Sequence, residues 1–252
     1  MMNSSIPGFP LDGYSKKAHT HGENPATLSP LLTGLFPAGV VGAELQIPSN
    51  PSLLYPEEVL ALGRAHPKRV QEFTAGRLCA RRALSEFGFT TYPLLISTDG
   101  QPHWPDTLCG SISHTAGMCG AVVGEKNKVR GIGLDIEIVA QVTAELWPTI
   151  CTPREIAWLS KLPHPQQTRC AALIFCAKES FYKCQYSVTH QWLEFDAVEL
   201  DVSTPLSETG WFVLIPQKKI ILLDQAETPL RGRYVFYKDL IITGIHFETA
   251  LN

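Results

Sequence analysis

The sequence predicts an α+β fold built from two halves of similar make-up. In the first half, helical patterns are followed by short strand patterns, and the same order returns in the second half. Helices and strands that come in separate runs are typical of α+β proteins, in which an antiparallel sheet packs on helices. A turn near residues 125–130 separates the two series, although the halves share no residue-level repeat. We therefore divide the chain into an irregular segment at 1–30, an N-terminal half at 31–126 and a C-terminal half at 127–252.

The composition is that of a soluble globular protein. The 252 residues carry a net charge of −3 and are 44% hydrophobic. A negative chain exerts no general attraction on nucleic acid, so an anionic ligand would need a local basic patch. The apolar runs are too short to cross a bilayer, and residues 1–10 lack the pattern of a secretory signal. Seven cysteines without a C-x-x-C pair indicate reduced thiols in the cytoplasm.

The elements of the N-terminal half follow from hydrophobic period and from turn residues. Residues 1–30 are rich in Pro, Gly, Ser, His and Asn and show no period, which predicts an irregular segment. The patterns after it predict, in order, a strand at 40–47, helices at 56–66 and 67–87 that each begin with proline, a strand at 94–98, a turn at Asp99-Gly100, a returning strand from 101 to 104, and a strand at 119–123.

The helix at 67–87 carries a basic edge. Arg77 and Arg81 lie four residues apart on one flank of its apolar stripe. Lys68 and Arg69 add charge near its start, and Arg82 near its middle. A guanidinium meets a phosphate through two parallel hydrogen bonds, so this edge is a candidate anion clamp. A charged flank that only faces solvent is the alternative explanation.

The stretch from 109 to 115 combines small and polar residues. Ser111 and Ser113 point to the same side of a strand-like segment, and His114 follows them. Hydroxyls, an imidazole and unobstructed backbone N–H groups together can hold a phosphate. A histidine that only caps a turn is the simpler alternative.

The strand at 129–139 places two acids side by side. Asp135 and Glu137 share one face with Gly133, whereas the opposite face is apolar. Two like charges held close together are unfavourable unless a cation or a proton lies between them, and carboxylate oxygens suit Mg²⁺. The alternative is a solvated strand end that happens to carry two acids.

The pattern from 166 to 185 is the clearest helix in the chain. Glu179 and Lys183 lie on a face different from its apolar stripe, and their neighbours Ala172 and Cys176 are small, which indicates that another element packs close to the pair. The alternative is a surface ion pair between residues four apart. A Thr152-Pro153 helix start precedes this helix. The strand patterns that follow it lie at 197–202, 211–215, 219–223, 233–237 and 241–247.

Taken together, these stretches resemble one family. In this order they are similar to the motifs of the 4′-phosphopantetheinyl transferases of the surfactin-synthetase-activating superfamily, and most similar to the enterobactin-synthase component D type. The resemblance spans roughly residues 55–200. It rests on Gly76-Arg77-Leu78-Cys79-Ala80-Arg81, Trp104-Pro105, Gly110-Ser111-Ile112-Ser113-His114, Gly133-Leu134-Asp135-Ile136-Glu137 and Phe175-Cys176-Ala177-Lys178-Glu179-Ser180-Phe181-Tyr182-Lys183.

The resemblance implies an activity and a place for it. It implies a monomer whose halves are related by a pseudo-two-fold axis, with the active site at the seam. It implies transfer of the 4′-phosphopantetheine arm of coenzyme A to a serine of an apo acyl, aryl or peptidyl carrier protein, with release of adenosine 3′,5′-bisphosphate. The implied ion is Mg²⁺, with Mn²⁺ as the alternative. The carriers left open are those of fatty-acid, polyketide and nonribosomal peptide synthesis, siderophore synthesis included.

The resemblance also implies residue roles. Asp135, Glu137 and Glu179 would hold the ion, with Glu179 as the first candidate for the base and Glu137 as the second. Lys183 would bind the diphosphate and stabilise the leaving bisphosphate. The remaining residues implied to contact phosphate groups or the adenine edge of coenzyme A are Ser113, His114, Arg77, Arg81 and Lys68.

Two other readings fit part of the sequence. The three acids alone would also suit a Mg²⁺-dependent nucleotide pyrophosphate hydrolase or nuclease, but the lack of a broad basic tract argues against nucleic acid as a partner. An inactive module that keeps the fold and binds carrier proteins is the other alternative. The intact acids and Lys183 argue against it.

Overall fold

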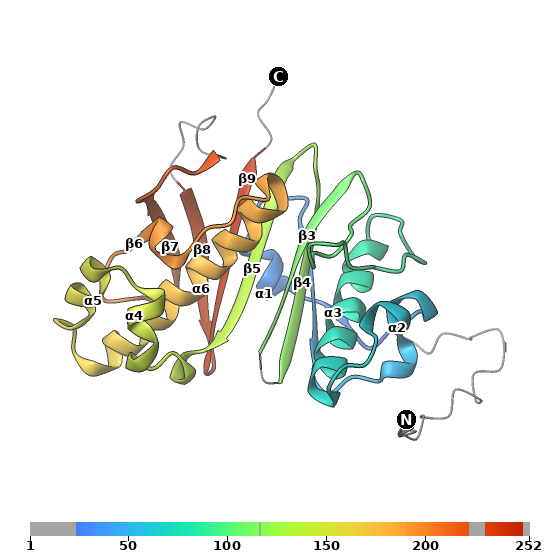
Figure 1. Ribbon diagram of the computed structural model, residues 1–252, viewed down its shortest axis with the longest axis horizontal. Coiled ribbons are helices and arrows are strands. Elements are labelled where there is room, and N and C mark those ends of the chain that lie inside the picture. Colours follow the sequence, from blue (N-terminus) through green and yellow to red (C-terminus); the bar gives the residue numbers. More distant parts are fainter. Residues whose placement is uncertain (1–23, 116, 222–229, 249–252) are drawn as a thin grey trace, which may run out of the picture.

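Two antiparallel sheets lie side by side in the computed structural model, and each packs on one long helix (Figure 1). The structure describes residues 24–115, 117–221 and 230–248. The predicted α+β class and its two-part arrangement are confirmed. The chain passes from the first sheet to the second in the short turn after residue 125.

The first sheet belongs to the N-terminal part of the chain. Its strands, in spatial order, are β1 (Thr27–Leu28), β2 (Val41–Gln46), β4 (Met118–Glu125) and β3 (Leu108–Thr115). The helices of this part are α1 (Pro30–Thr33), η1 (Pro51–Leu53), α2 (Pro56–Leu62) and α3 (Pro67–Ser85). Helices α2 and α3 each begin with a proline, as predicted, because a first-turn residue needs no N–H donor. Helix α3 packs on β2 and β4 through small side chains such as Ala75 and Ala80.

The second sheet belongs to the C-terminal part. Its strands, in spatial order, are β5 (Val129–Ile138), β9 (Leu240–Glu248), β8 (Leu230–Tyr237), β7 (Thr209–Pro216) and β6 (Val198–Asp201). The helices of this part are η2 (Val139–Gln141), η3 (Ala144–Leu146), α4 (Trp147–Ile150), α5 (Pro153–Leu159), α6 (His164–Thr189) and η4 (Phe195–Ala197). Helix α6 packs chiefly on β5 and β9.

Helix α6 comes unusually close to β5 because two glycines of the strand leave room for it. A methyl group on Gly133 would lie only 1.8 Å from the carbonyl oxygen of Ser180, and one on Gly131 would lie 3.0 Å from that of Cys184. On the neighbouring strand, the hydroxyl of Thr243 donates to the carbonyl of Cys176 at 2.8 Å. The prediction that another element packs close beside the small residues of α6 is confirmed.

The two sheets meet edge to edge at β3 and β5, and two serines join them. Ser111 Oγ accepts from the N–H of Leu134 at 3.0 Å, and Ser113 Oγ accepts from the N–H of Ile136 at 3.2 Å. Leu134 and Ile136 point away from α6 into a core that draws residues from both parts of the chain. The halves therefore share one hydrophobic core as well as a row of hydrogen bonds.

Some predicted elements differ from those observed. The strand expected at 94–98 is absent: residues 95–103 form a small hairpin whose only ladder contact is the bridge between Ile96 and Pro102. The physical reason is that side chains take the backbone groups of Leu94, since its N–H donates to Glu58 and its carbonyl accepts from Arg77. In the expected strand at 219–223, residues 219–221 are not strand, and 222–223 lie outside the described residues.

The expected irregular segment at 1–30 is described only from residue 24. Thr27 and Leu28 form the short edge strand β1, which was not foreseen, and Ala26 is buried against α3. Helix α6 runs from His164 to Thr189 and is longer than the predicted 166–185. The prediction was too short because both ends of the helix are polar and show no hydrophobic period.

Candidate active site

The acids of β5 face helix α6, as the alternation of the strand predicts. Ile132, Leu134 and Ile136 are fully buried in the shared core, so Asp135 and Glu137 are on the opposite side. Asp135 is itself only 2% exposed. A buried carboxylate is costly unless a positive charge or hydrogen-bond donors compensate for it.

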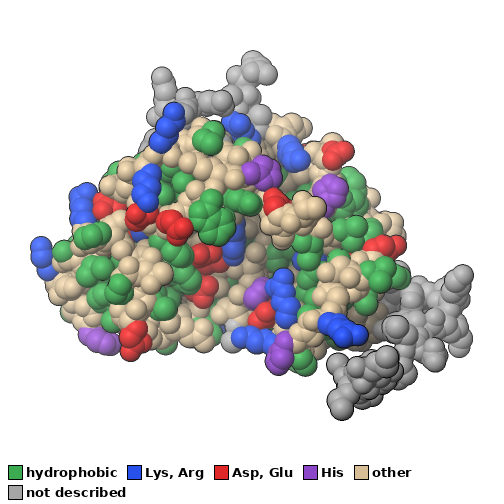
Figure 2. Space-filling view, in the orientation of Figure 1, with side chains coloured by type: hydrophobic (Ala, Val, Ile, Leu, Met, Phe, Trp, Pro, Cys, Tyr) green, Lys and Arg blue, Asp and Glu red, His purple; other side chains and the backbone are tan. Residues whose placement is uncertain are grey.

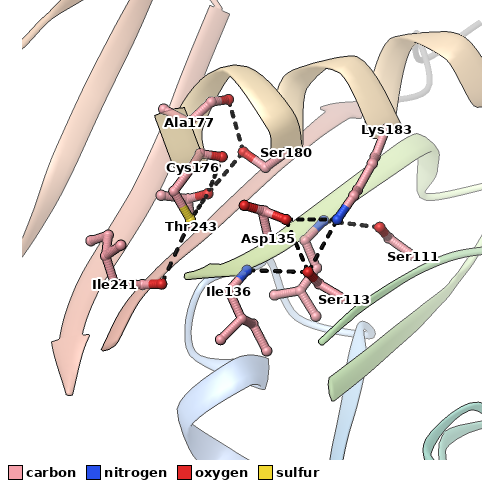
Figure 3. Close-up of polar contacts among 11 residues, drawn as sticks. Ser111, Ser113, Asp135, Ile136, Cys176, Ala177, Ser180, Lys183, Ile241 and Thr243 are labelled. Carbon is pink, nitrogen blue, oxygen red and sulfur yellow. Dashed lines mark hydrogen bonds and ion pairs between the residues drawn. The ribbon is translucent and has the colours of Figure 1, made fainter. Parts of the chain in front are cut away.

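Lys183 of α6 supplies that positive charge, and Ser113 of β3 joins the pair (Figure 3). Lys183 Nζ lies 2.6 Å from Asp135 Oδ1 and 3.1 Å from Ser113 Oγ. Ser113 Oγ in turn donates to Asp135 Oδ1 at 2.9 Å. Three elements that are distant in sequence thus meet at one point on the seam, where acidic and basic side chains gather on the surface (Figure 2).

The second oxygen of Asp135 is a buried acceptor without a partner. Asp135 Oδ2 has no hydrogen bond within the described part of the chain. An orphaned carboxylate oxygen in an acidic cluster is the kind of group that a hard divalent cation binds. In this conformation, however, no three His, Cys, Asp or Glu side chains among the described residues are arranged to enclose a metal ion.

The three carboxylates of the cluster interact electrostatically. Burial raises the pKa of Glu137 to about 7, with a further contribution from Asp135 that Lys183 partly offsets. Burial also raises the pKa of Glu179, and Asp135 again adds to the shift. Burial alone would lower the pKa of Lys183, but the charge of Asp135, its hydrogen bond to Lys183 and the charge of Glu179 together raise that pKa. Each added negative charge is therefore unfavourable here, and a cation would relieve the repulsion.

His114 follows Ser113 and lies at the edge of the same cluster. Its Nδ1 is 3.8 Å from Glu72 Oε1. Burial lowers the pKa of His114, Glu72 opposes that shift, and the positive charges of Lys183 and Arg69 add to it. Arg69, which the sequence places with Lys68 at the basic start of α3 but without a role in the site, thus acts on His114. The side chain of Lys68 is 79% exposed and pairs with Glu72 at 3.9 Å.

The two arginines of α3 are placed differently from one another. Arg81 has both terminal nitrogens occupied, by Glu58 Oε2 at 2.7 Å and by the carbonyl of Leu53 at 2.9 Å. Arg77 stacks on Phe73, and its Nε donates to the carbonyl of Leu94, but its terminal nitrogens make no hydrogen bond within the described residues. Burial lowers the pKa of Arg77 to about 10. Of the two, Arg77 keeps donors available for an anion.

A cavity of about 200 Å³ opens beside Glu179. It lies between α6 and the segment that follows this helix. Its lining is mainly apolar, from Lys178, Glu179, Phe181, Tyr182, Trp192, Leu193, Glu194, Phe195 and Val198. Trp192 is 69% exposed and stands edge-on to Tyr182. Sequence reasoning missed this cavity because residues 190–195 have no regular period that would place their side chains.

Comparisons with known proteins agree with the resemblance drawn from the motifs. Residues 57–124 match the family described as 4′-phosphopantetheinyl transferase N-terminal domain. Residues 131–221 match the 4′-phosphopantetheinyl transferase superfamily. Both matches contain the residues discussed above, with Arg77, Ser113 and His114 in the first and the acids and Lys183 in the second.

Individual relatives point the same way. The chain is 34% identical over 229 residues to 4′-phosphopantetheinyl transferase PptT of Mycobacterium tuberculosis, covering 87% of this chain and 99% of that protein. It is 40% identical over 164 residues to enterobactin synthase component D of Salmonella typhimurium, covering 61% of this chain and 67% of that protein. The structure of Thermotoga maritima holo-acyl-carrier-protein synthase is more distant, with a TM-score of 0.37 at 20% identity, covering 48% of this chain and 64% of that one.

Within the described residues, no helix combines the length and the hydrophobicity that a membrane span requires. All seven cysteines are buried and unpaired.

Proposed function

The chain belongs to the 4′-phosphopantetheinyl transferase superfamily and is a holo-carrier-protein synthase, and on that premise we propose the reaction it carries out. A serine hydroxyl of an apo carrier protein attacks the β-phosphorus of coenzyme A. A phosphodiester bond to the serine forms, the bond to the bridging oxygen of the diphosphate breaks, and adenosine 3′,5′-bisphosphate leaves. The serine proton passes to a carboxylate of the enzyme.

The observation that carries this proposal is the meeting of Lys183 with Asp135 at the seam. A diphosphate needs positive charge, and Lys183 offers it in a partly closed site where water screens charges weakly. In the proposed complex, Lys183 moves from Asp135 to a diphosphate oxygen and stabilises the charge that develops on the leaving bisphosphate.

We assign Asp135, Glu137 and Glu179 to a divalent cation, Mg²⁺ or in its place Mn²⁺. The orphaned oxygen of Asp135 and the mutual repulsion of the three carboxylates fit such an ion. When bound, it would neutralise charge on the diphosphate oxygens. The side chains do not enclose an ion in this conformation, so the assignment requires Lys183 to leave Asp135 and the carboxylates to turn inward.

Glu179 is the proposed base for the serine hydroxyl, with Glu137 as the second candidate. A general base works best with a pKa near the working pH, and burial raises the pKa of both groups toward neutrality. We favour Glu179 because it also lines the cavity proposed for the pantetheine arm, whose phosphate is the one attacked.

The nucleotide end of coenzyme A is assigned to the N-terminal half. Arg77, whose terminal nitrogens make no hydrogen bond to any described residue, and His114 are the proposed contacts of the 3′-phosphate. We add Arg69 to them because its charge acts on His114. Ser113 is proposed to contact a phosphate once Lys183 has moved. Arg81 and Lys68 are proposed only as secondary contacts of coenzyme A. Arg81 is paired with Glu58, and Lys68 faces solvent.

The apolar cavity beside Glu179 is the proposed place for the pantetheine arm. The arm is neutral, and its apolar parts gain from contact with aromatic side chains such as Tyr182 and Trp192. We further propose that the protein acts in the cytoplasm as a monomer on acyl, aryl or peptidyl carrier proteins. We propose that the N-terminal half ends at residue 126 and that the C-terminal half begins at residue 127.

The test is to incubate the protein with coenzyme A, Mg²⁺ and an apo carrier protein, and to weigh the intact carrier. We expect the carrier to gain the mass of phosphopantetheine, and the gain to disappear when EDTA removes the divalent ion. Hydrolysis of coenzyme A with no change in the carrier would instead assign a pyrophosphate hydrolase. Carrier binding with neither reaction would assign an inactive module.

A further inference from the structure

A buried ion pair joins the residue that precedes the proposed base in α6 to helix α5. Lys178 Nζ is 2.6 Å from Glu155 Oε2 and donates to the carbonyl of Ile150 at 3.0 Å. The two side chains are only 2% and 4% exposed. Lys178 is the residue before Glu179 in α6, so this pair fixes the helix at the point where it presents Glu179.

Glu155 is held from several directions at once. At the start of α5 it forms a capping box with Thr152, in which each residue accepts from the backbone N–H of the other, at 2.8 and 3.2 Å. Its second oxygen, Oε1, accepts from the N–H of Leu200 in β6 at 2.8 Å. Thr152 also donates to Glu199, a neighbour of Leu200, at 2.6 Å. Glu155 is therefore a fixed anchor that ties α5 and β6 together.

The opposite side of α6 is fixed as well. The backbone of Ser180 packs directly over Gly133 of β5, so the helix cannot shift toward the strand. This contact sets the distance between helix and strand, and the hydrogen bond from Thr243 to the carbonyl of Cys176 holds the same side of α6. The contact of Lys178 with Glu155 of α5 adds a further fixed point, at the residue directly before Glu179.

Stability alone does not explain the pair. Removing two charges from water is costly, and apolar side chains of similar size often stabilise a core as well or better. A charged pair is, however, directional, because its hydrogen bonds permit only a narrow range of positions for each partner. The cavity beside Glu179 is lined by Lys178 too, so the same contact shapes its wall.

We propose that Lys178 is a positioning residue that acts through Glu155 to hold the carboxylate of Glu179 in line with Asp135 and the cavity. This inference rests on the proposed function, because it concerns the base of that reaction. It separates the two neighbouring charges of α6 by role. Glu179 acts on the substrate, whereas the ammonium group of Lys178 is bound by Glu155 and the carbonyl of Ile150 and acts on the position of Glu179.

The test uses the double variant Glu155→Gln/Lys178→Met, which removes both charges and so leaves neither one unpaired in the core. The wild type is assayed first, and lack of carrier modification there would overturn the proposed function. In the double variant we expect a folded protein whose kcat is lower by roughly 10- to 100-fold, the scale of a displacement of about 1 Å, with KM for coenzyme A within about threefold. Lys178→Arg, which keeps the charge, should recover part of that loss.

A matched control is the exposed pair of Lys218 and Asp196, which has the same 2.6 Å separation but side chains 50% and 55% exposed. Lys218→Met/Asp196→Asn should leave kcat unchanged. A readout without activity is the crystal structure of the Glu155→Gln/Lys178→Met protein, in which we expect the carboxylate of Glu179 to be displaced relative to Asp135.

Several outcomes would overturn the inference. One is a folded double variant with wild-type kcat. A rise in KM alone would assign Lys178 to binding, and an unfolded double variant would assign the pair to the fold. An unmoved Glu179 in the crystal structure would also overturn it, whatever the rates.

Discussion

Replacing Gly133 with alanine tests whether the close approach of α6 to β5 is needed for the reaction. The added methyl carbon would lie 1.8 Å from the carbonyl oxygen of Ser180, whereas real contacts of this kind are essentially never under 3.0 Å. The helix must therefore retreat by about 1.2 Å, the difference between these two distances. Backbone cannot turn aside as a side chain can, so the strain falls on the packing of the whole helix.

The retreat affects both stability and rate. Overpacking a well-packed core costs about 1–3 kcal/mol of unfolding free energy. The same movement would stretch the 2.6 Å contact between Lys183 and Asp135 and carry Glu179 out of place. Because a misplacement of about 1 Å can lower a rate roughly 100-fold, we expect Gly133→Ala to lose activity far beyond its loss of stability.

The assay is the rate of carrier modification per folded molecule, with the unfolding free energy measured by denaturant. The matched control is Gly76→Ala in α3, where the methyl carbon would meet only the side chain of Ile112 at 3.1 Å. Alanine is favoured over glycine in a helix by about 1 kcal/mol, which offsets that contact. A folded Gly133→Ala protein with the kcat of the control would refute this account of the seam.

Three further predictions follow from the site. Asp135→Ala and Glu179→Ala should nearly abolish carrier modification while the circular dichroism spectrum stays native. Lys183→Ala should cost about 2–4 kcal/mol of transition-state stabilisation. Wild-type rates of carrier modification in these variants would exclude the roles assigned to the three residues. Ser111→Ala should lower the unfolding free energy by about 1–3 kcal/mol, because it leaves a buried backbone N–H of β5 without its acceptor; equal denaturant midpoints would contradict this. Glu137 has its pKa raised from 4.5 to about 7. Between these two pH values the folded protein keeps the Glu137 proton, whereas the unfolded chain has lost it. In the absence of a divalent ion, the free energy of unfolding should therefore fall as the pH rises from 4.5 to about 7. Glu137→Gln should remove that part of the pH dependence in thermal unfolding, and an unchanged profile would exclude Glu137 as its source.

The strand and the helix that carry the acidic residues of the site were predictable from the sequence for physical reasons. Strand alternation separates Asp135 from the apolar side chains beside it, and the helical period separates Glu179 and Lys183 from the buried stripe. Both signals are local, so they need no knowledge of the tertiary structure. The small residues of α6 even indicated that another element would pack close to the pair.

Contacts between distant residues were not predictable in the same way. Arg77 and Arg81 have equivalent positions in the helical pattern, and only the fold shows that Glu58 occupies one of them. The strand expected at 94–98 fails because side chains from α2 and α3 take the backbone groups of Leu94. The buried pair of Lys178 and Glu155 likewise joins residues too far apart in sequence for any periodic pattern to connect them.

The most direct test of the account is a crystal structure of the protein with coenzyme A and Mg²⁺. We expect the diphosphate at the seam, with Lys183 moved from Asp135 to a diphosphate oxygen and an ion bound by Asp135, Glu137 and Glu179. Coenzyme A bound away from the seam, with Lys183 still paired to Asp135, would contradict it.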